Sequence, residues 1–117
     1  MKKVLHANNC DVAYAMTVLG GKWKIAIIWK LVGRRLRYSQ LRAALGSISE
    51  GVLINQLKEL EKDNIISRIV YNEVPPHVEY ELTSDGKQLE QALREIERWG
   101  AQRRLSVKEY KRTGVID

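Results

Sequence analysis

The chain has 117 residues, 44% of them hydrophobic, which is enough for one compact domain with its own core. Its longest uninterrupted apolar run is IAIIW, and its start, MKKVLHANNC, lacks the apolar segment of a signal peptide, so we expect a single cytoplasmic domain with no membrane partner. The net charge of +6 is uneven, since residues 1–46 carry nine of the 20 Lys and Arg residues and one of the 14 acidic residues; this favours a polyanionic partner, with solubility alone as the alternative.

The first half of the chain predicts four helices. DVAYAMTVL at 11–19 is helix-compatible, and KWKIAIIWKLV at 22–32 is apolar almost all round, as expected of a buried helix, although its β-branched residues leave a strand open. After a short basic extended piece, RRLRY, we expect a third helix capped by Ser39 and ended by Gly46. Ser49 is expected to cap a fourth helix, EGVLINQLKELEKD.

The second half predicts a hairpin followed by a long helix. IISRIVY and VEYEL read as two antiparallel strands joined at Pro75-Pro76, and Asn64 stands where a positive φ is expected after the fourth helix. Thr83 is expected to cap a helix over 84–112, with a bend near Gly100. The fold class is therefore α+β and mostly helical: a single winged helix-turn-helix domain, with the helix-turn-helix at 39–63 and the wing at 65–82.

Cysteine, histidine and loop motifs point away from an enzyme. A single cysteine, Cys10, excludes an internal disulfide and a multi-thiolate zinc site. The sequence has no glycine-rich phosphate loop and no nucleophile elbow. We expect no catalytic residue, no metal and no cofactor.

Several stretches resemble the HxlR-type transcriptional regulators of bacteria. They are GGKW, RYSQLRAALGSIS, LINQLKELEKDNIISR and EVPPHVEYELTSDGKQL, together with the lone early cysteine and a Trp-Gly pair at 99–100. The resemblance covers roughly residues 10–100 and implies a dimeric winged helix-turn-helix protein that binds double-stranded DNA as a repressor or activator. It also implies that the first and last helices, 11–19 and 84–112, build most of the dimer.

The fourth helix is the predicted recognition helix. With Leu53, Leu57 and Leu60 turned to the core, the opposite face meets DNA. On that face Asn55 is the predicted base reader because its amide can bond adenine at two points, and Ile54 lies where it can touch a thymine methyl. Backbone or phosphate roles are expected for Ser49, Gly51 and Lys58. A solvated polar face is the alternative.

Further phosphate contacts are expected around the entry to the third helix. The candidates are Arg35 and Arg37, with Ser39 at the expected cap and Lys22 ahead of the second helix. A solvated basic loop is the alternative.

The wing tip combines two prolines with a histidine. Pro75 and Pro76 remove two donors where no ladder partner is needed, and they limit the freedom that the loop loses on docking; protection against edge-to-edge aggregation is compatible with this role. The related family commonly has arginine where His77 stands. We expect an exposed His77 to contact phosphate when charged, so that binding strengthens from about pH 8 to 6.

The last helix and the single thiol have two interpretations each. We expect Leu89, Leu93, Ile96 and Trp99 to form a dimer interface, since a small domain offers them few partners; packing within one chain is the alternative. Some HxlR-type relatives sense oxidants or electrophiles through a thiol at the position of Cys10, while a small buried structural residue is the other interpretation.

Three functions stay open from the sequence. A sequence-specific homodimeric transcription factor on a pseudo-palindromic operator fits the charge and the resemblance. A thiol-redox or small-molecule sensor acting through Cys10 or a dimer pocket, and through the same DNA binding, is the second. A winged-helix protein–protein adaptor is the third.

Overall fold

The computed structural model describes residues 10–114 as an α+β chain with a three-stranded sheet. In chain order its elements are α2 (Asp11–Leu19), α3 (Lys24–Lys30), β1 (Leu36–Arg37), α4 (Tyr38–Leu45), α5 (Glu50–Lys62), β2 (Ile66–Tyr71), β3 (His77–Leu82), α6 (Ser84–Lys87) and α7 (Glu90–Thr113). The chain divides into two compact units, the first ending at Lys87 and the second beginning at Gln88. Whether the two act as one domain stays a prediction.

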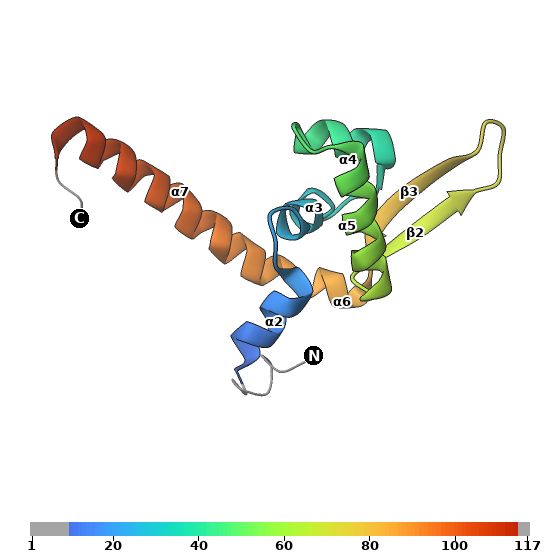
Figure 1. Ribbon diagram of the computed structural model, residues 1–117, viewed down its shortest axis with the longest axis horizontal. Coiled ribbons are helices and arrows are strands. Elements are labelled where there is room, and N and C mark those ends of the chain that lie inside the picture. Colours follow the sequence, from blue (N-terminus) through green and yellow to red (C-terminus); the bar gives the residue numbers. More distant parts are fainter. Residues whose placement is uncertain (1–9, 115–117) are drawn as a thin grey trace. The chain divides into compact units, whose positions relative to one another are not determined.

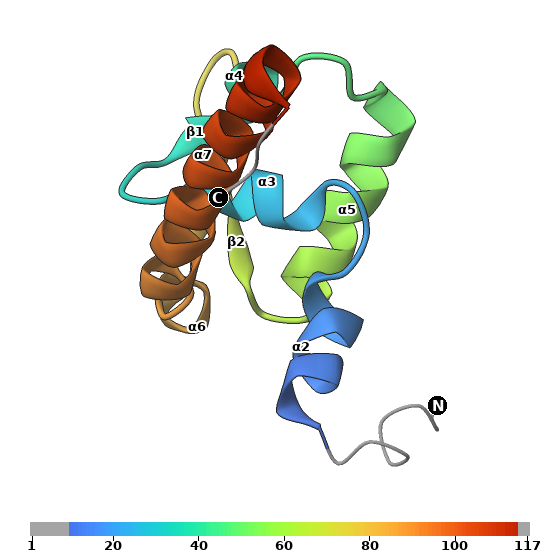
Figure 2. The ribbon, with the colours of Figure 1, turned by 90° about the vertical axis from the view of Figure 1, so that its left-hand side faces the viewer.

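The core of the first unit lies among α3, α4, α5 and the sheet. The predicted stripe of α5, Leu53, Leu57 and Leu60, is buried, and Ile27, Ile28 and Leu41 from α3 and α4 are fully enclosed. In Figure 2 the end of α5 lies beside β2, which follows it after a tight turn. The winged helix-turn-helix architecture expected from the sequence is confirmed.

Local signals place the ends of the recognition helix. The Ser49 hydroxyl accepts a hydrogen bond from the Val52 amide at 3.3 Å, which satisfies one of the free donors at the start of α5. Asn64 has a φ of 60°, the left-handed conformation that turns the chain from α5 into β2. Both predictions are confirmed.

The start of α4 differs from the prediction. Arg37, the last extended residue, is the N-cap, and its backbone N–H donates to the Gln40 side chain at 2.9 Å. Ser39 therefore lies inside the first turn and is not the cap. The reason is that β1 runs directly into α4, which leaves no loop residue between them.

The sheet has the order β1-β3-β2 and is antiparallel throughout, with Arg68 opposite Tyr80 and Tyr71 opposite His77. Because side chains alternate along a strand, the hairpin has two distinct faces. The groove face, which turns to α5, consists of Ile66, Arg68, Val70, Val78, Tyr80 and Leu82. The outer face consists of Ser67, Ile69, Tyr71, His77, Glu79 and Glu81.

The β2–β3 hairpin projects beyond α3, α4 and α5 as a wing (Figure 1). Its strands end at Tyr71 and restart at His77, so both prolines lie in the tip, outside the ladder, as predicted. Val74 beside them is 98% exposed, which leaves the tip free to meet a partner.

The second unit is dominated by α7, a single long helix (Figure 1). The bend expected near Gly100 is wrong, because α7 continues through that residue. One glycine costs a helix about 1 kcal/mol, too little to break a run of strong helix formers. The interruption falls earlier, between the end of α6 at Lys87 and the start of α7 at Glu90. Thr83 caps α6 as predicted, accepting from the Gly86 amide at 3.0 Å.

Among residues 10–114, no helix combines the length and the apolar character that crossing a membrane requires.

Candidate nucleic-acid interface

The face of α5 that turns away from the core carries the predicted reading residues. Gly51, Asn55 and Lys58 are exposed, and Ile54 at their flank is 40% exposed. A Cβ added to Gly51 would meet no atom within 4 Å, so the backbone there is open to close approach. The structure thus brings together the residues predicted on this helix, next to its capped N-terminus.

Asn55 is held by a chain of polar contacts that reaches the core. Its Nδ2 donates to Glu59 Oε2 at 3.2 Å, and the other oxygen of Glu59 lies 2.6 Å from Nζ of Lys24 on α3. Lys24 is only 7% exposed, so this acid supplies the counter-charge that a buried lysine needs. The hydrogen bond from Lys24 lowers the pKa of Glu59 below its ordinary value, which keeps the carboxylate charged.

This chain of contacts fixes how Asn55 presents its amide. Since Nδ2 is turned to Glu59, Oδ1 and the second amide hydrogen remain for a partner, and together they match adenine N6 and N7. Lys24 and Glu59 were not among the residues predicted from the sequence. The signal was present, since a lysine in the middle of an apolar helix requires an acidic partner.

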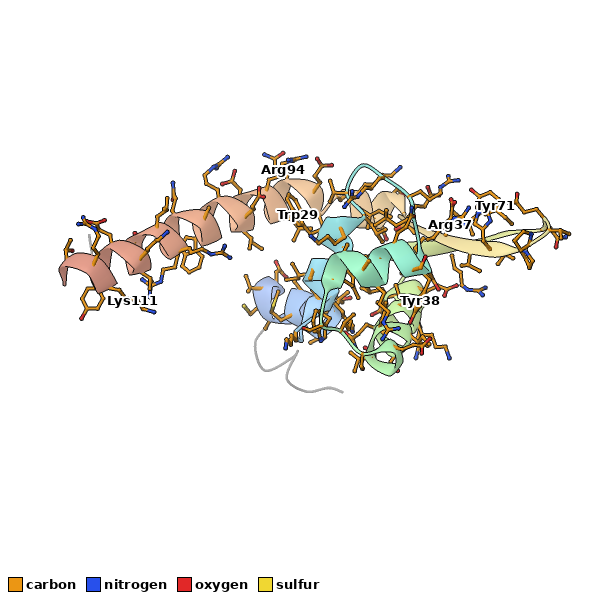
Figure 3. All side chains as sticks on the ribbon, turned by 90° about the horizontal axis from the view of Figure 1, so that it is seen from above. Trp29, Arg37, Tyr38, Tyr71, Arg94 and Lys111 are labelled. Carbon is orange, nitrogen blue, oxygen red and sulfur yellow. The ribbon has the colours of Figure 1, made fainter. Side chains whose placement is uncertain are left out.

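Three further predicted phosphate ligands are exposed in the first unit. Arg37 stands at the base of the wing (Figure 3), and Ser39 lies on the first turn of α4. Lys22 is exposed just before α3, with its Nζ 5.0 Å from the centroid of the Trp23 ring. All three are accessible to a DNA backbone.

Arg35 is engaged within the protein. Its Nη2 lies 3.0 Å from Glu81 Oε1 and its Nη1 donates to the Tyr71 hydroxyl at 2.6 Å, both on the outer face of the wing. The bonds to Glu81 and then to Tyr71 raise the pKa of the guanidinium above its ordinary value. Arg35 therefore links the segment before β1, to which it belongs, with the outer face of the wing. The sequence did not reveal this role.

His77 is not the exposed tip residue that the sequence predicted. It stacks on Tyr71 with ring centroids 4.5 Å apart, and its side chain is 17% exposed. Nδ1 lies 3.2 Å from Glu73 and Nε2 lies 3.2 Å from Glu79. The expectation of free exposure is wrong because the hairpin register sets His77 directly opposite an aromatic ring, beside two acids.

The predicted dimer stripe is divided. Leu93 is 4% exposed, whereas Ile96 and Trp99 are 52% and 65% exposed. Leu89 stands just before α7 and is half-buried. In the first unit, α2 also exposes apolar side chains, namely Val12, Tyr14 and Met16.

Cys10 is exposed at the N-cap of α2, which contradicts the buried structural alternative. In the part of the chain that the structure describes, no cluster of three His, Cys, Asp or Glu side chains is placed to hold a metal ion.

A winged helix-turn-helix with an exposed, polar recognition face is a DNA-binding architecture. Residues 18–108 of this chain match the HxlR-like helix-turn-helix family. The chain belongs to the HxlR-like helix-turn-helix family. It is therefore a winged-helix transcriptional regulator of the HxlR-like class, and the resemblance noted from its motifs is confirmed.

Individual HxlR-like relatives match over most of their length. The chain is 36% identical over 117 residues to the HTH-type transcriptional regulator YybR of Bacillus subtilis (strain 168), covering 98% of this chain and 94% of that protein. It is 45% identical over 93 residues to YtcD of the same organism, covering 80% and 74%. Among solved structures, the redox regulator HypR in its reduced form aligns with a TM-score of 0.79 at 37% identity, covering 86% of this chain and 100% of that one.

Proposed function

We propose that two copies of this chain form a homodimer that binds a pseudo-palindromic operator and represses transcription in the cytoplasm, where bacterial DNA lies. The observation that carries the proposal is the exposed face of α5, with Asn55 held ready by Glu59 and Lys24. A recognition helix presents its N-terminal residues to the base edges of the major groove. Transcriptional regulators are not enzymes, and no catalytic activity is part of the proposal.

The roles follow from position on the helix. Asn55 reads adenine, Ile54 contacts a thymine methyl, and Gly51 lets the helix approach the bases closely. Ser49 and the amides at the start of α5 bind a phosphate. The side chains that contact the DNA backbone are Arg37, Ser39, Lys22 and Lys58. Arg35 and His77 have partners inside the wing. We therefore assign them a structural role in the wing rather than a contact with DNA.

The dimer is supported by exposed apolar side chains on two helices. Ile96 and Trp99 on α7 would each leave more than half of their surface in water in a monomer, as would Leu105 on another side of the same helix. On α2, Val12 and Tyr14 do the same. Covering such residues is the usual driving force of a homodimer interface.

Selection of bound sequences from a random DNA pool tests the proposal. We expect enrichment of an inverted repeat with half-sites centred one helical turn, about 34–36 Å, apart. Sedimentation at micromolar concentration should give a dimer. A clean monomer, or a pool that shows no enrichment, would contradict the proposal and favour the protein–protein adaptor.

A second function has one specific observation in its favour. Cys10 is exposed at the start of α2, and structural neighbours with 37% and 33% identity are named as the redox regulator HypR and the regulator YodB in its reduced form. We propose that oxidation of Cys10 changes operator affinity. The test compares affinity before and after treatment with a thiol oxidant in the native protein and in Cys10→Ser; an equal response in both rejects this role.

A further inference from the structure

A groove separates the recognition helix from the wing. It has a volume of about 440 Å³ and is lined by Ile54, Leu57, Lys58 and Glu61 from α5 and by Arg68 and Tyr80 from the sheet. Its floor is set by Leu57 and Tyr80, which are 2% and 8% exposed. The exposed residues of its lining are Ile54, Lys58 and Glu61 on α5 and Arg68 on the sheet.

These two cations differ from the charges of the outer face. Within residues 10–114, neither Lys58 nor Arg68 has an acidic side chain within ion-pair distance, whereas Arg35 and His77 are matched by Glu81, Glu73 and Glu79. Glu61, the one acid of the lining, lies nearly one helical turn from Lys58, on the side away from the DNA-facing end of α5. The lining therefore carries two cations against one acid.

The position of the groove fits a DNA backbone. If α5 enters the major groove and the wing lies at the neighbouring minor groove, the sugar–phosphate strand that separates those two grooves must pass between them. The space between α5 and the wing is the groove described above. A strand carrying one charge per phosphate thus meets two cations that have no partner in the protein.

We propose that Lys58 and Arg68 hold a backbone phosphate of the operator between α5 and the wing. The guanidinium of Arg68 makes the directed contact, because its planar fork can donate to two phosphate oxygens at once, while Lys58 adds a point charge. Glu61 limits the depth to which the backbone enters by repelling it. The inference rests on the proposed DNA binding and adds Arg68, a residue that the sequence did not single out, to the interface.

Salt dependence gives the first test. Arg68→Gln should lower operator affinity about tenfold per subunit and shallow the slope of log affinity against log salt by about 0.9 per subunit, or about 1.8 for the homodimer, equally on operator and random duplex. Arg68→Lys should keep most of the slope, and Glu61→Gln should strengthen binding. The matched control is Arg104→Gln, which removes the same charge from an exposed site on α7 and should change the slope little.

Neutral DNA linkages give the second test without altering the protein. Each phosphate of the operator is replaced in turn by a methylphosphonate, and the affinity of the native protein, Arg68→Gln and Arg104→Gln is measured. At one linkage in each half-site, between the major-groove and minor-groove contacts, we expect the neutral group to weaken the native protein and Arg104→Gln strongly. Arg68→Gln, which keeps only the Lys58 charge at that phosphate, should be weakened less.

The outcomes separate this inference from the proposed function. If the native protein binds no duplex at all, both the proposed function and the phosphate contact are rejected. If it binds its operator but every neutral linkage weakens Arg68→Gln as much as the native protein, the phosphate contact is rejected while DNA binding stands.

Discussion

The two faces of the wing sheet use charge in opposite ways. On the outer face, cations and acids satisfy one another: Arg35 bonds Glu81 and Tyr71, and His77 lies between Glu73 and Glu79. On the groove face, buried Ile66 and Leu82 are followed toward the tip by Arg68, which has no acidic partner among the described residues. The charges of the outer face are therefore used within the wing, and we propose that the unmatched charge of the groove face is available to DNA.

The difference shows that residue type alone does not tell which cations are available to a partner. Arg35 and Arg37 are two residues apart and look alike in the sequence. One is bound within the protein and the other stands exposed at the base of the wing. Residues two apart in an extended segment share a side, so alternation does not separate them. The partners that Arg35 meets across the fold, Glu81 and Tyr71, decide the outcome, and they are not visible in the local sequence.

The largest expected effect tests whether the groove face carries the stability of the wing. Ile66→Ala should lower the free energy of unfolding by about 2–5 kcal/mol, because Ile66 is 2% exposed against the core. Ile69→Ala, on the half-buried outer face, should cost less than about 1.5 kcal/mol. Chemical denaturation of both variants measures the contrast, and equal losses would remove the distinction.

The next effect concerns Lys58 and Glu59, neighbours on α5 with opposite roles. Glu59→Gln leaves Lys24 buried without a counter-charge and should lower the melting temperature, whereas Lys58→Gln should leave it nearly unchanged. Because the pKa of Glu59 is lowered by Lys24, its contribution is complete above the ordinary value of 4.5 and is lost as pH falls through the lower folded value. Melting curves measured from pH 7 to 3 should show this loss of stability at low pH in the native protein but not in Glu59→Gln.

Most of the fold could be predicted from the sequence because its signals are local. Leucine spacing identified α5, Ser49 and Asn64 marked its ends, and the prolines marked the wing tip. The predictions that were wrong share a cause, because each depends on contacts between elements that lie far apart in the sequence. Arg37 caps α4 because β1 pairs with β3, and His77 is covered because Tyr71 stands opposite it.

The candidate site could likewise be predicted where its signals are local, but not where it depends on contacts between elements. The periodicity of α5 placed Gly51, Asn55 and Lys58 on one exposed face, and the structure agrees. The contacts that position Asn55 join α5 to α3 and so cross between elements that no spacing rule relates. Arg68 was missed because one arginine in a strand gives no hint of which face it occupies.

Two arginine variants test, through DNA binding, which cations at the base of the wing are available to a partner. Arg37→Ala should shallow the salt slope by about 0.9 per subunit, or about 1.8 for the homodimer, since each phosphate contact releases counterions. Arg35→Ala should leave the slope almost unchanged and instead reduce protection of the β2–β3 amides from hydrogen exchange, because the link to Glu81 is lost. The same slope change in both variants would place Arg35 on the DNA.

The smallest expected effect is at His77. Since its ring nitrogens contact two carboxylates on the outer face, His77→Ala should change operator affinity by less than about twofold at pH 8. The measurement is repeated at pH 6 with His77→Arg as the comparison. A tenfold loss for His77→Ala at pH 6 alone would return His77 to the phosphate contact that the sequence suggested.

We propose that α5 reads DNA sequence through Asn55, which Glu59 and Lys24 hold in place. The most direct measurement is the affinity of the native protein and of Asn55→Ala for the selected operator and for random duplex, at one fixed salt concentration. We expect Asn55→Ala to lose about 1–3 kcal/mol of binding free energy per half-site on the operator and almost none on random DNA. An equal loss on both would contradict the claim and remove Asn55 from base reading.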